Sequence, residues 1–329
     1  MRLQILTPHY KEEPWEMAPL LNSIAMQVAV DFREVGVIIV YDGEEATPLP
    51  EEDWKGFPFD IKYVRIPHGG VSAARNAALD AATAEYVMYC DADDMFFHLC
   101  GLNILFHEMA IGFDSLTTLF VEETRHPQTN EPVFVQHPND TTFVHGKVHR
   151  REYLVENNIR WNPKLTIHED SYFNVLARCV SKDPERVKYM SQGIYMWRWR
   201  PNSICRQDPE YVQKTYPLLI DSNDALVDEL ERRGMTDHAR FYTAGPILSA
   251  YFEMNEPAWL YSKYREKAEK RVGEFYIKHR DLWDAIPAQQ KVEMSNDLRP
   301  NHIRKGMKIE EMSLPEWMRH IETLGGEKC

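Results

Sequence analysis

Residues 86–94 read YVMYCDADD, an apolar run that ends abruptly in three carboxylates. A short apolar run bounded by polar residues is typical of a β-strand, and a continuous run indicates a strand buried on both faces. Similar runs occupy residues 3–7, 35–41 and 61–66, and helical patterns occupy residues 15–29 and 73–82. Strands that alternate with helices predict an α/β fold, with a mostly parallel sheet flanked by helices.

The middle of the chain is mixed, and its last third is helical. Strands are expected over residues 116–122, 133–136 and 193–199, and helices over residues 150–157 and 171–180. Helical patterns then cover residues 211–233, 238–255 and 258–280. The change of pattern between residues 201 and 209 predicts two domains, residues 1–205 and a helical C-terminal region over residues 206–329.

Composition narrows the class of protein. Hydrophobic residues form 43% of the 329 residues, which is enough for a sizeable core. The five cysteines form no CxxC pair, and their odd number favours reduced thiols over a disulfide framework or a zinc site. The sequence shows neither a signal-peptide pattern nor an apolar run long enough to span a bilayer. We therefore expect a cytoplasmic protein without a transmembrane segment.

The negative charge of the chain is unevenly distributed. The net charge is -13, yet residues 258–308 carry 12 Lys and Arg against 7 Asp and Glu. An acidic body disfavours long-range attraction to nucleic acid, whereas a local basic face could still contact a phosphate backbone. The alternative interpretation of this segment is an ordinary solvated helix surface.

The carboxylates of Asp91, Asp93 and Asp94 follow directly after a buried strand. Like charges this close repel each other, so their burial costs free energy unless a cation is present. Mg²⁺ and Mn²⁺ bind a few carboxylates together with phosphate oxygens of a substrate. The pattern favours a metal–diphosphate site, and the alternative is a solvated acidic turn.

Residues 68–76 read HGGVSAARN. Glycines such as Gly70 let a backbone approach a ligand closely, and Ser72 is expected to cap a helix whose N-terminus favours anions. Arg75 carries a fixed charge that can pair with a phosphate or a carboxylate. An ordinary turn followed by an amphipathic helix leaves Arg75 and Asn76 unexplained.

Two further segments carry candidate site residues. Glu169 and Asp170 open a predicted helix, where a carboxylate could act as general base. His168 before them, or His145 or His149 further upstream, could complete a metal shell. Charge at a helix start and a structural histidine are the alternatives. Arg198 and Arg200 alternate with tryptophans along a predicted strand, so their guanidiniums share one face and could clamp a diphosphate. A solvent face of arginines opposite a tryptophan core face is the alternative.

In this order, the segments up to about residue 205 resemble the family 2 glycosyltransferases, which have the GT-A fold. The family opens with a strand and Pro-x-Tyr, here Pro8 to Tyr10, and continues with a strand that ends in Asp-Gly, here Asp42-Gly43. GxSxARN follows at residues 70–76, then DxDD at residues 91–94, and "ED" begins 76 residues after Asp93.

The resemblance implies a role for each matching residue. Tyr10 and Asp42 would contact the nucleotide base, Asp91 the ribose, and Asp93 a Mn²⁺ or Mg²⁺ ion at the diphosphate. Arg75 would support the donor site, with Arg198 or Arg200 at the diphosphate. Asp170, next to Glu169, would be the base of an inverting transfer from a nucleotide sugar, by default a UDP-sugar. Tyr41 stands where the family has a second acid, and the helical C-terminus matches no family motif.

The acceptor is left open by the sequence. A glycan, a protein or a lipid-linked acceptor is the first interpretation. Residues 145–170 also resemble a bacteriophage subgroup, which implies hydroxymethylated pyrimidines of DNA as the alternative acceptor, in the host cytoplasm, with the basic residues 258–308 along the DNA backbone. The helical region would shape the acceptor site or an oligomer contact.

Two readings outside glycosyl transfer also remain. A catalytically silent module that binds sugar nucleotides would keep the fold without the reaction. A nucleotidyltransferase would need a glycine-rich basic loop after the first strand, and residues 8–13 contain no glycine.

Overall fold

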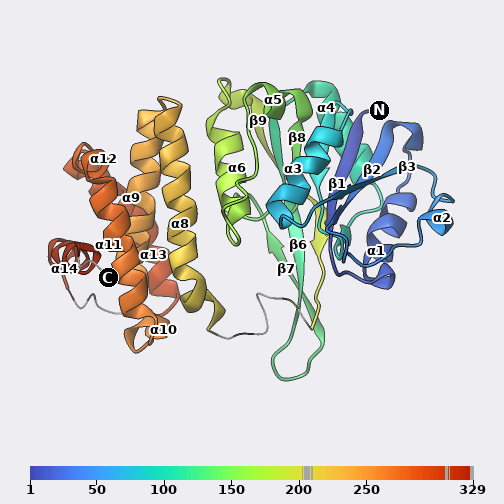
Figure 1. Ribbon diagram of the computed structural model, residues 1–329. Helices are drawn as coiled ribbons and strands as arrows, with labels where there is room; N and C mark the ends of the chain where they lie inside the picture. Colours follow the sequence, from blue (N-terminus) through green and yellow to red (C-terminus); the bar gives the residue numbers. More distant parts are fainter. Residues whose placement is uncertain (202, 204–207, 209, 308–309, 311, 327–329) are drawn as a thin grey trace. The chain divides into compact units, whose positions relative to one another are not determined.

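The computed structural model describes residues 1–201, 203, 208, 210–307, 310 and 312–326 (Figure 1). The chain divides into two compact units, Met1–Pro201 and Asn202–Cys329. The first unit is an α/β unit, and the second is built from helices.

The α/β unit is organised around one sheet with the strand order β3-β2-β1-β4-β8-β6-β9-β5, in which β7 pairs with β6. The strands are β1 (Leu3–His9), β2 (Val35–Asp42), β3 (Asp60–Ile66), β4 (Tyr86–Tyr89), β5 (Met95–Phe96), β6 (Ser115–Arg125), β7 (Pro132–His137), β8 (Lys147–Arg150) and β9 (Val187–Trp197). Strands β1 to β4 are mutually parallel, as expected. The second half is mixed, because β8 runs antiparallel to both of its neighbours and β6 runs parallel to β9.

The helices of this unit are α1 (Pro14–Ala25), α2 (Glu51–Trp54), α3 (Val71–Ala81), α4 (Gly101–Ile111), α5 (Arg151–Glu156) and α6 (Glu169–Cys179), with 3-10 turns at Phe32–Glu34 and Pro184–Arg186. The prediction of an α/β sheet flanked by helices is confirmed. The first helix ends at Ala25 instead of residue 29. Helix α4 and strand β8 were not predicted from the sequence.

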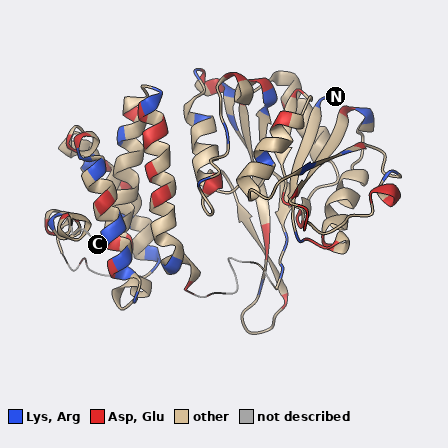
Figure 2. Ribbon diagram, viewed as in Figure 1, with Lys and Arg blue, Asp and Glu red and all other residues tan. Residues whose placement is uncertain are grey.

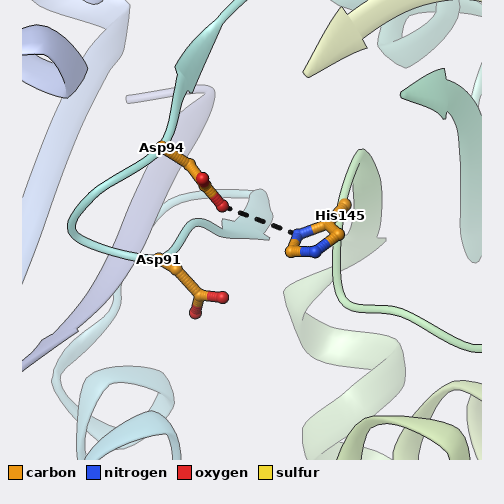
Figure 3. Close-up of side chains that lie close together, drawn as sticks. All are labelled: Asp91, Asp94 and His145. Atoms are coloured by element: carbon orange, nitrogen blue, oxygen red, sulfur yellow. Dashed lines mark ion pairs between the residues drawn. The ribbon is translucent and has the colours of Figure 1, made fainter. Parts of the chain in front are cut away.

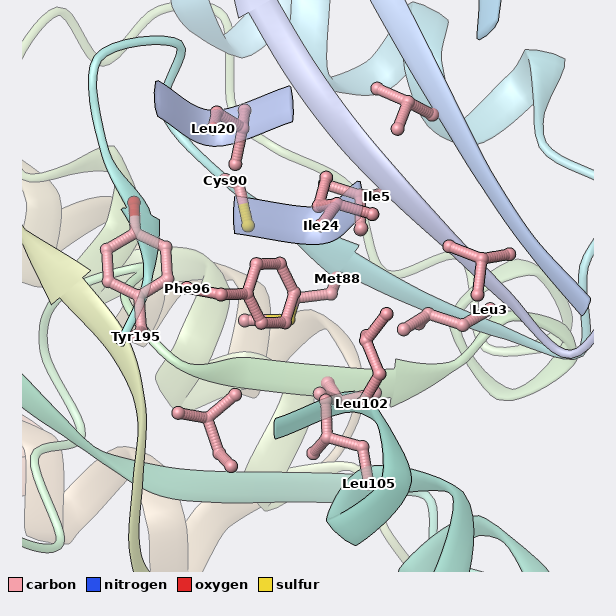
Figure 4. Packing of buried hydrophobic residues seen from close by; sticks show 14 of the residues in the cluster. Leu3, Ile5, Leu20, Ile24, Met88, Cys90, Phe96, Leu102, Leu105 and Tyr195 are labelled. Atoms are coloured by element: carbon pink, nitrogen blue, oxygen red, sulfur yellow. The ribbon is translucent and has the colours of Figure 1, made fainter. Parts of the chain in front are cut away.

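The core explains why these strands are apolar along their whole length. Helices α1 and α4 cover one face of the sheet, where their leucines pack against β1 and β4 (Figure 4). Helix α3 packs against β1 and β2 and buries Ala74, Ala78 and Leu79. Because β1, β2 and β4 are parallel and buried on both faces, their carboxyl ends meet at one edge of the sheet.

The helical unit contains α8 (Tyr211–Arg232), α9 (Thr236–Glu253), α10 (Pro257–Leu260), α11 (Arg265–Lys278), α12 (Arg280–Asp284), α13 (Ala288–Arg304) and α14 (Leu314–Gly326). The single helix predicted over residues 258–280 is wrong, because the chain leaves helical geometry between α10 and α11. Helices α11 and α14 touch through glycines: a Cβ on Gly273 would lie 1.9 Å from the carbonyl oxygen of Ile321. None of the helices among the described residues is both long and apolar enough to cross a membrane.

Candidate functional site

The carboxyl ends of β1, β2 and β4 bring the N-terminal motifs together. Pro8 is the second-to-last residue of β1, and Tyr10 directly follows that strand. Asp42 is the last residue of β2. Asp91 lies two residues beyond the end of β4. Ligands of open parallel sheets bind at such an edge, so the motifs occupy the expected position for a site.

Arg75 connects two acidic motifs that are far apart in the sequence. Its side chain is 4% exposed and donates to Asp91 Oδ1 at 2.8 Å and to Glu169 Oε1 at 2.9 Å. The guanidinium carbon lies 4.4 Å from the ring centre of Trp161. The two acids are 16 and 94 residues away from Arg75, so this one cation fixes the N-terminus of α6 beside the loop after β4.

Asn76 explains the second half of the ARN sequence. Its amide group donates to the backbone oxygen of Trp161 at 2.8 Å and accepts from the backbone nitrogen of Trp161 at 3.0 Å. The Trp161 ring stacks on Phe173 of α6 at 4.2 Å, with an interplanar angle of 3°. Asn76 thus holds the ring against which Arg75 packs.

The charges around Arg75 set the protonation of Asp91. Burial alone would raise the pKa of the Asp91 carboxyl, but the adjacent Arg75 guanidinium holds that pKa below its usual value. The two neighbouring carboxylates also raise the pKa of Arg75, against the effect of its burial. Asp91 is therefore ionised in this pair, and 30% of its side chain remains exposed.

Asp94 has a structural environment. It is 1% exposed, and it accepts from the Tyr195 hydroxyl and from the backbone nitrogen of Arg198 at 2.9 Å. His145 Nδ1 lies 3.7 Å from Asp94 Oδ2, and atoms of Asp91, Asp94 and His145 lie within 4.8 Å of one another (Figure 3). Burial and the charges of its neighbours raise the pKa of Asp94 well above its usual value. Both carboxylate oxygens of Asp94 therefore already accept hydrogen bonds within the protein.

Asp93 lies between Asp91 and a pair of arginines. Burial and the Asp91 charge raise the pKa of Asp93 to about 6, although Arg200 forms an ion pair with its carboxylate and opposes this shift. Arg198 donates to the backbone oxygen of Asp93 at 3.0 Å. The two arginines follow β9, which ends at Trp197, and do not lie on the strand as the alternation of residues suggested. Both arginine side chains nevertheless contact Asp93.

Asp42 supports the glycine turn. Its two carboxylate oxygens accept from the backbone nitrogens of Gly69 and Gly70, at 2.7 and 3.0 Å. Gly70 has a φ of 81°, which side chains rarely adopt, and it is the residue that precedes α3. The expectation that Ser72 caps this helix is wrong: Ser72 lies inside the first turn, and its buried hydroxyl has no hydrogen-bond partner in the described part of the chain.

The Tyr10 ring stacks on His68, with ring centres 4.8 Å apart and an interplanar angle of 24°. His68 Nδ1 lies 3.0 Å from Asp42 Oδ2. The two residues to which the family resemblance gives base contacts, Tyr10 and Asp42, are thus joined through His68. Half of the His68 side chain is exposed, so this aromatic pair presents a face to solvent.

Glu169 and Asp170 differ in their partners. Glu169 is held by Arg75, whereas the Asp170 carboxylate accepts from the backbone nitrogen of Ser171 at 2.8 Å. Burial and the Glu169 charge raise the pKa of Asp170 to about 7. A carboxyl group with a pKa near neutrality is well matched to general-base work.

His168 precedes α6 in the left-handed conformation, with a φ of 62°. This conformation costs a non-glycine residue roughly 1 kcal/mol or more and often marks functional segments. Within the described residues of the α/β unit, the group of possible metal ligands contains Asp91, Asp94 and His145, without His168 or Asp93; a second group, Asp224, Asp228 and His279, lies in the helical unit.

Sequence reasoning missed several residues of this site. Glu16 and Trp161 come from segments without a recognisable motif, yet Glu16 pairs with Arg200 and Trp161 packs against Arg75. Tyr195 lies in the stretch that contains Arg198 and Arg200 but was given no role, although its hydroxyl donates to Asp94. His145 was a candidate metal ligand, and it lies 3.7 Å from Asp94. Asn76 gave a signal, since an amide inside an alanine-rich helix called for an explanation. The remaining contacts depend on pairs of residues far apart in the chain.

Comparisons with known proteins agree with this geometry. Residues 4–103 match the family model described as "Glycosyl transferase family 2". The chain is 27% identical to the uncharacterized glycosyltransferase EpsJ of Bacillus subtilis (strain 168), over 66% of this chain and 68% of EpsJ. It is 35% identical to the succinoglycan biosynthesis protein ExoM of Rhizobium meliloti (strain 1021), over 24% of this chain and 26% of ExoM.

Solved structures with the same fold include two nucleotide-sugar complexes. TarS 1-349 of S. aureus in complex with UDP-GlcNAc has a TM-score of 0.50 at 16% identity and covers 92% of each chain. The mannosyltransferase PcManGT from Pyrobaculum calidifontis, in complex with GDP-Man and Mn²⁺, has a TM-score of 0.50 at 14% identity and covers 98% of this chain and 86% of its own. At these identities the likeness shows the fold alone.

The fold is shared with TarS and with the mannosyltransferase PcManGT. Residues 4–103 match the family 2 model, and the relative that extends beyond this segment is also a glycosyltransferase, so the chain is a glycosyltransferase with a family 2 segment over residues 4–103.

Replacing Arg75 by alanine tests whether this residue holds the site together. The change leaves Asp91 and Glu169 without their shared cation, so we expect a loss of about 3–5 kcal/mol in the free energy of unfolding. Urea denaturation measures that loss. Arg160→Ala is the matched control, since Arg160 pairs with Asp80 at the surface and its loss should cost no more than about 1 kcal/mol. Equal losses in both variants would contradict a special role for Arg75.

Proposed function

We propose that this glycosyltransferase inverts the configuration of the transferred sugar and uses a divalent cation at Asp91 and Asp93. In this proposal the donor is a UDP-sugar, the acceptor is a saccharide hydroxyl, and Asp170 is the base. The bridge that Arg75 forms between Asp91 and Glu169 carries the proposal, because it brings the carboxylate after Glu169 to the edge where the donor would bind.

The donor set fits Mn²⁺ or Mg²⁺. Asp91 and Asp93 keep 30% and 13% of their side chains exposed, whereas both oxygens of the buried Asp94 already have partners. Burial and the Asp91 charge raise the pKa of Asp93, and a hard divalent cation would relieve the repulsion between the two carboxylates. When bound, the cation would neutralise charge on the leaving diphosphate. His168 belonged to the ligand set expected from the sequence, but we assign the cation to the two aspartates.

Asp170 is the better of the two candidate bases. One oxygen of Glu169 accepts from Arg75, whereas Asp170 combines a pKa of about 7 with a hydrogen bond from the backbone nitrogen of Ser171. The acceptor hydroxyl would attack the anomeric carbon as the bond from that carbon to the diphosphate oxygen breaks. Its proton would pass to Asp170, and one displacement inverts the anomeric configuration.

The two arginines after β9 are suited to the diphosphate. Arg198 and Arg200 both reach Asp93, the residue to which we assign the cation. A guanidinium can form two parallel hydrogen bonds to phosphate oxygens. UDP is our choice of nucleotide because TarS binds UDP-GlcNAc, and GDP is the alternative that PcManGT suggests.

The helical unit offers a place for the acceptor. A cavity of about 400 Å³ lies between α8, α9 and α13, within the usual size range of ligand pockets. Tyr216, Phe241 and Tyr242 supply aromatic walls, and Glu253 supplies a buried carboxylate oxygen without a hydrogen-bond partner in the described residues. Aromatic faces and hydrogen-bond acceptors suit the C–H face and the hydroxyls of a saccharide. Such a subsite would hold a sugar of the acceptor chain.

The alternative DNA acceptor has less support. Figure 2 shows Lys and Arg interspersed with Asp and Glu along the helices of the helical unit. Seven of the described cations in residues 258–308 pair with carboxylates of this unit, so fewer are available for phosphates. Arg271, for example, binds Asp221 and Asp224 at 2.6 Å, and Arg280 binds Glu322. Counterion release, the main source of affinity for a DNA backbone, requires unpaired cations.

Replacing Asp93 by asparagine tests the metal assignment. In a thermal-shift experiment with Mn²⁺, a nucleoside diphosphate at 100 times its dissociation constant should stabilise the unaltered protein by about 2.7 kcal/mol. Asp93→Asn should lose this Mn²⁺-dependent shift, and Asp53→Asn, which changes an exposed aspartate, should keep it. Retention of the shift by Asp93→Asn would remove Asp93 from the cation site.

Replacing Asp170 by asparagine separates binding from chemistry. We expect nucleotide affinity to remain unchanged while kcat falls by about 10²–10⁴-fold, because the amide cannot accept the proton. Sugar transfer is measured by release of the nucleoside diphosphate, with the surface change Asp80→Asn as the control. Full turnover by Asp170→Asn would mean that another group is the base. Donor binding without any turnover of the unaltered protein would favour the silent binding module.

The cavity of the helical unit is tested with Phe241→Ala and Glu253→Gln. Both should raise KM for a saccharide acceptor by about tenfold, which corresponds to roughly 1.4 kcal/mol of lost binding. Neither should change the slow hydrolysis of the donor in the absence of acceptor. Tyr261→Ala is the control, because Tyr261 is 96% exposed and does not line the cavity. An unchanged KM, or faster transfer to hydroxymethylated DNA than to saccharides, would contradict this acceptor site.

A further inference from the structure

The guanidinium of Arg200 lies between carboxylates from two different elements. It forms an ion pair with Asp93, in the loop after β4, and its Nη1 donates to Glu16 Oε1, on α1, at 3.2 Å. Arg198 contacts the same two residues: its Nη1 donates to the backbone oxygens of Asp93 at 3.0 Å and of Glu16 at 3.3 Å. The end of β9 is thus attached to both segments.

Glu16 is a fixed anchor in this arrangement. Its second carboxylate oxygen accepts from the backbone nitrogen of Glu13 at 2.8 Å, which forms half of the capping box at the start of α1. Its side chain is 18% exposed, and no motif marked it. Because Glu16 is held by the helix start, it can retain Arg200 after Asp93 has been released.

Asp93 cannot offer the same oxygen to Arg200 and to a cation. In the structure the Arg200 ion pair occupies Asp93 Oδ2, so a cation that arrives alone must first separate this pair. A diphosphate supplies another anion for the guanidinium, and the exchange frees Asp93. A ligand that binds only the open arrangement has its apparent affinity lowered by the fraction of protein in that arrangement.

We propose that Arg200 is a latch on the cation site: its ion pair with Asp93 blocks the cation until a diphosphate takes the guanidinium away. Glu16 is the positioning residue that keeps Arg200 beside the site. The latch makes cation binding depend on the diphosphate, because each ligand favours the arrangement that the other requires. By thermodynamic linkage the dependence is reciprocal. This inference rests on the proposed function, since it assumes that Asp93 holds the cation and that Arg200 binds the diphosphate.

The latch predicts effects of opposite sign for one substitution. Arg200→Gln removes the competing cation from Asp93, so the affinity for Mn²⁺ alone should increase, by roughly tenfold if the pair is closed nine-tenths of the time. The affinity for UDP or GDP should decrease in the same variant, because a charged partner of the diphosphate is lost. Glu16→Gln should also decrease nucleotide affinity, and it should increase the affinity for Mn²⁺ alone by less than Arg200→Gln does, because Arg200 is still present but held less firmly.

Electron paramagnetic resonance of free Mn²⁺ provides a readout that does not depend on activity. The full chain is titrated with Mn²⁺ at pH 8, first alone and then with UDP or with GDP. Arg33→Gln is the matched control, since Arg33 is 90% exposed and its side chain pairs with Asp31. Arg200→Lys is a second variant if Arg200→Gln has a lower unfolding temperature, and it should give a smaller change of the same sign.

The outcomes separate the latch from the proposed function. Tighter binding of Mn²⁺ alone by Arg200→Gln supports the latch. Unchanged, weaker or undetectable Mn²⁺ binding by this variant at millimolar concentration overturns it, even if the unaltered protein binds UDP with Mn²⁺ as proposed. Failure of the unaltered protein to bind either nucleotide in the presence of Mn²⁺ contradicts the proposed function, while the change caused by Arg200→Gln still decides whether a latch exists.

Discussion

The site depends on a buried arginine that has two anionic partners. A desolvated guanidinium is stable only when nearby carboxylates compensate its charge. Asp91 and Glu169 provide this compensation for Arg75. The requirement acts in both directions, because each acid is better stabilised beside the cation than alone. Helix α3 positions Arg75 and the sheet positions Asp91. Because Glu169 pairs with Arg75, the N-terminus of α6 lies beside Asp91, and Asp170 is placed there as the next residue.

The balance of charges among the other acids and arginines of the site favours the proposed metal binding and proton transfer. Arg75 forms ion pairs with Asp91 and Glu169, and Arg200 forms one with Asp93, whereas Asp94 and Asp170 are buried beside these acids. Burial, together with the charges of neighbouring carboxylates, raises the pKa values of Asp93, Asp94 and Asp170. A surplus of negative charge of this kind favours a divalent cation at the most accessible acids and a proton acceptor at the most isolated one. The same surplus explains why Arg200 forms an ion pair with Asp93.

Local patterns predicted the parts of the fold that are locally determined. The first four strands are apolar along their length because both faces are buried, and this signal can be read in the sequence. Strand β8 escaped prediction because its residues Lys147 and His149 are polar yet buried, and α4 because residues 101–111 lack a helical polar face. The acidic motifs and the ARN sequence were recognisable, but no local pattern indicates that Arg75 and Glu169 meet across 94 residues.

The same reasoning explains the errors about single residues. Ser72 has the chemistry of a helix cap, but Asp42 binds the backbone nitrogens of Gly69 and Gly70 and helix α3 begins directly after this turn. Alternation placed Arg198 and Arg200 on a strand, whereas β9 ends at Trp197 and the two arginines turn toward Asp93. In each case a contact with a distant carboxylate determined the geometry.

The most direct test of the account is a crystal structure of the protein with Mn²⁺ and UDP, in which anomalous scattering locates the cation. We expect Mn²⁺ on Asp93 and Asp91, Arg200 turned to the diphosphate, and Arg75 still bridging Asp91 and Glu169 with the Asp170 carboxylate facing the donor site. Mn²⁺ bound elsewhere, or Asp170 turned away while the nucleotide is bound, would contradict the proposed active site.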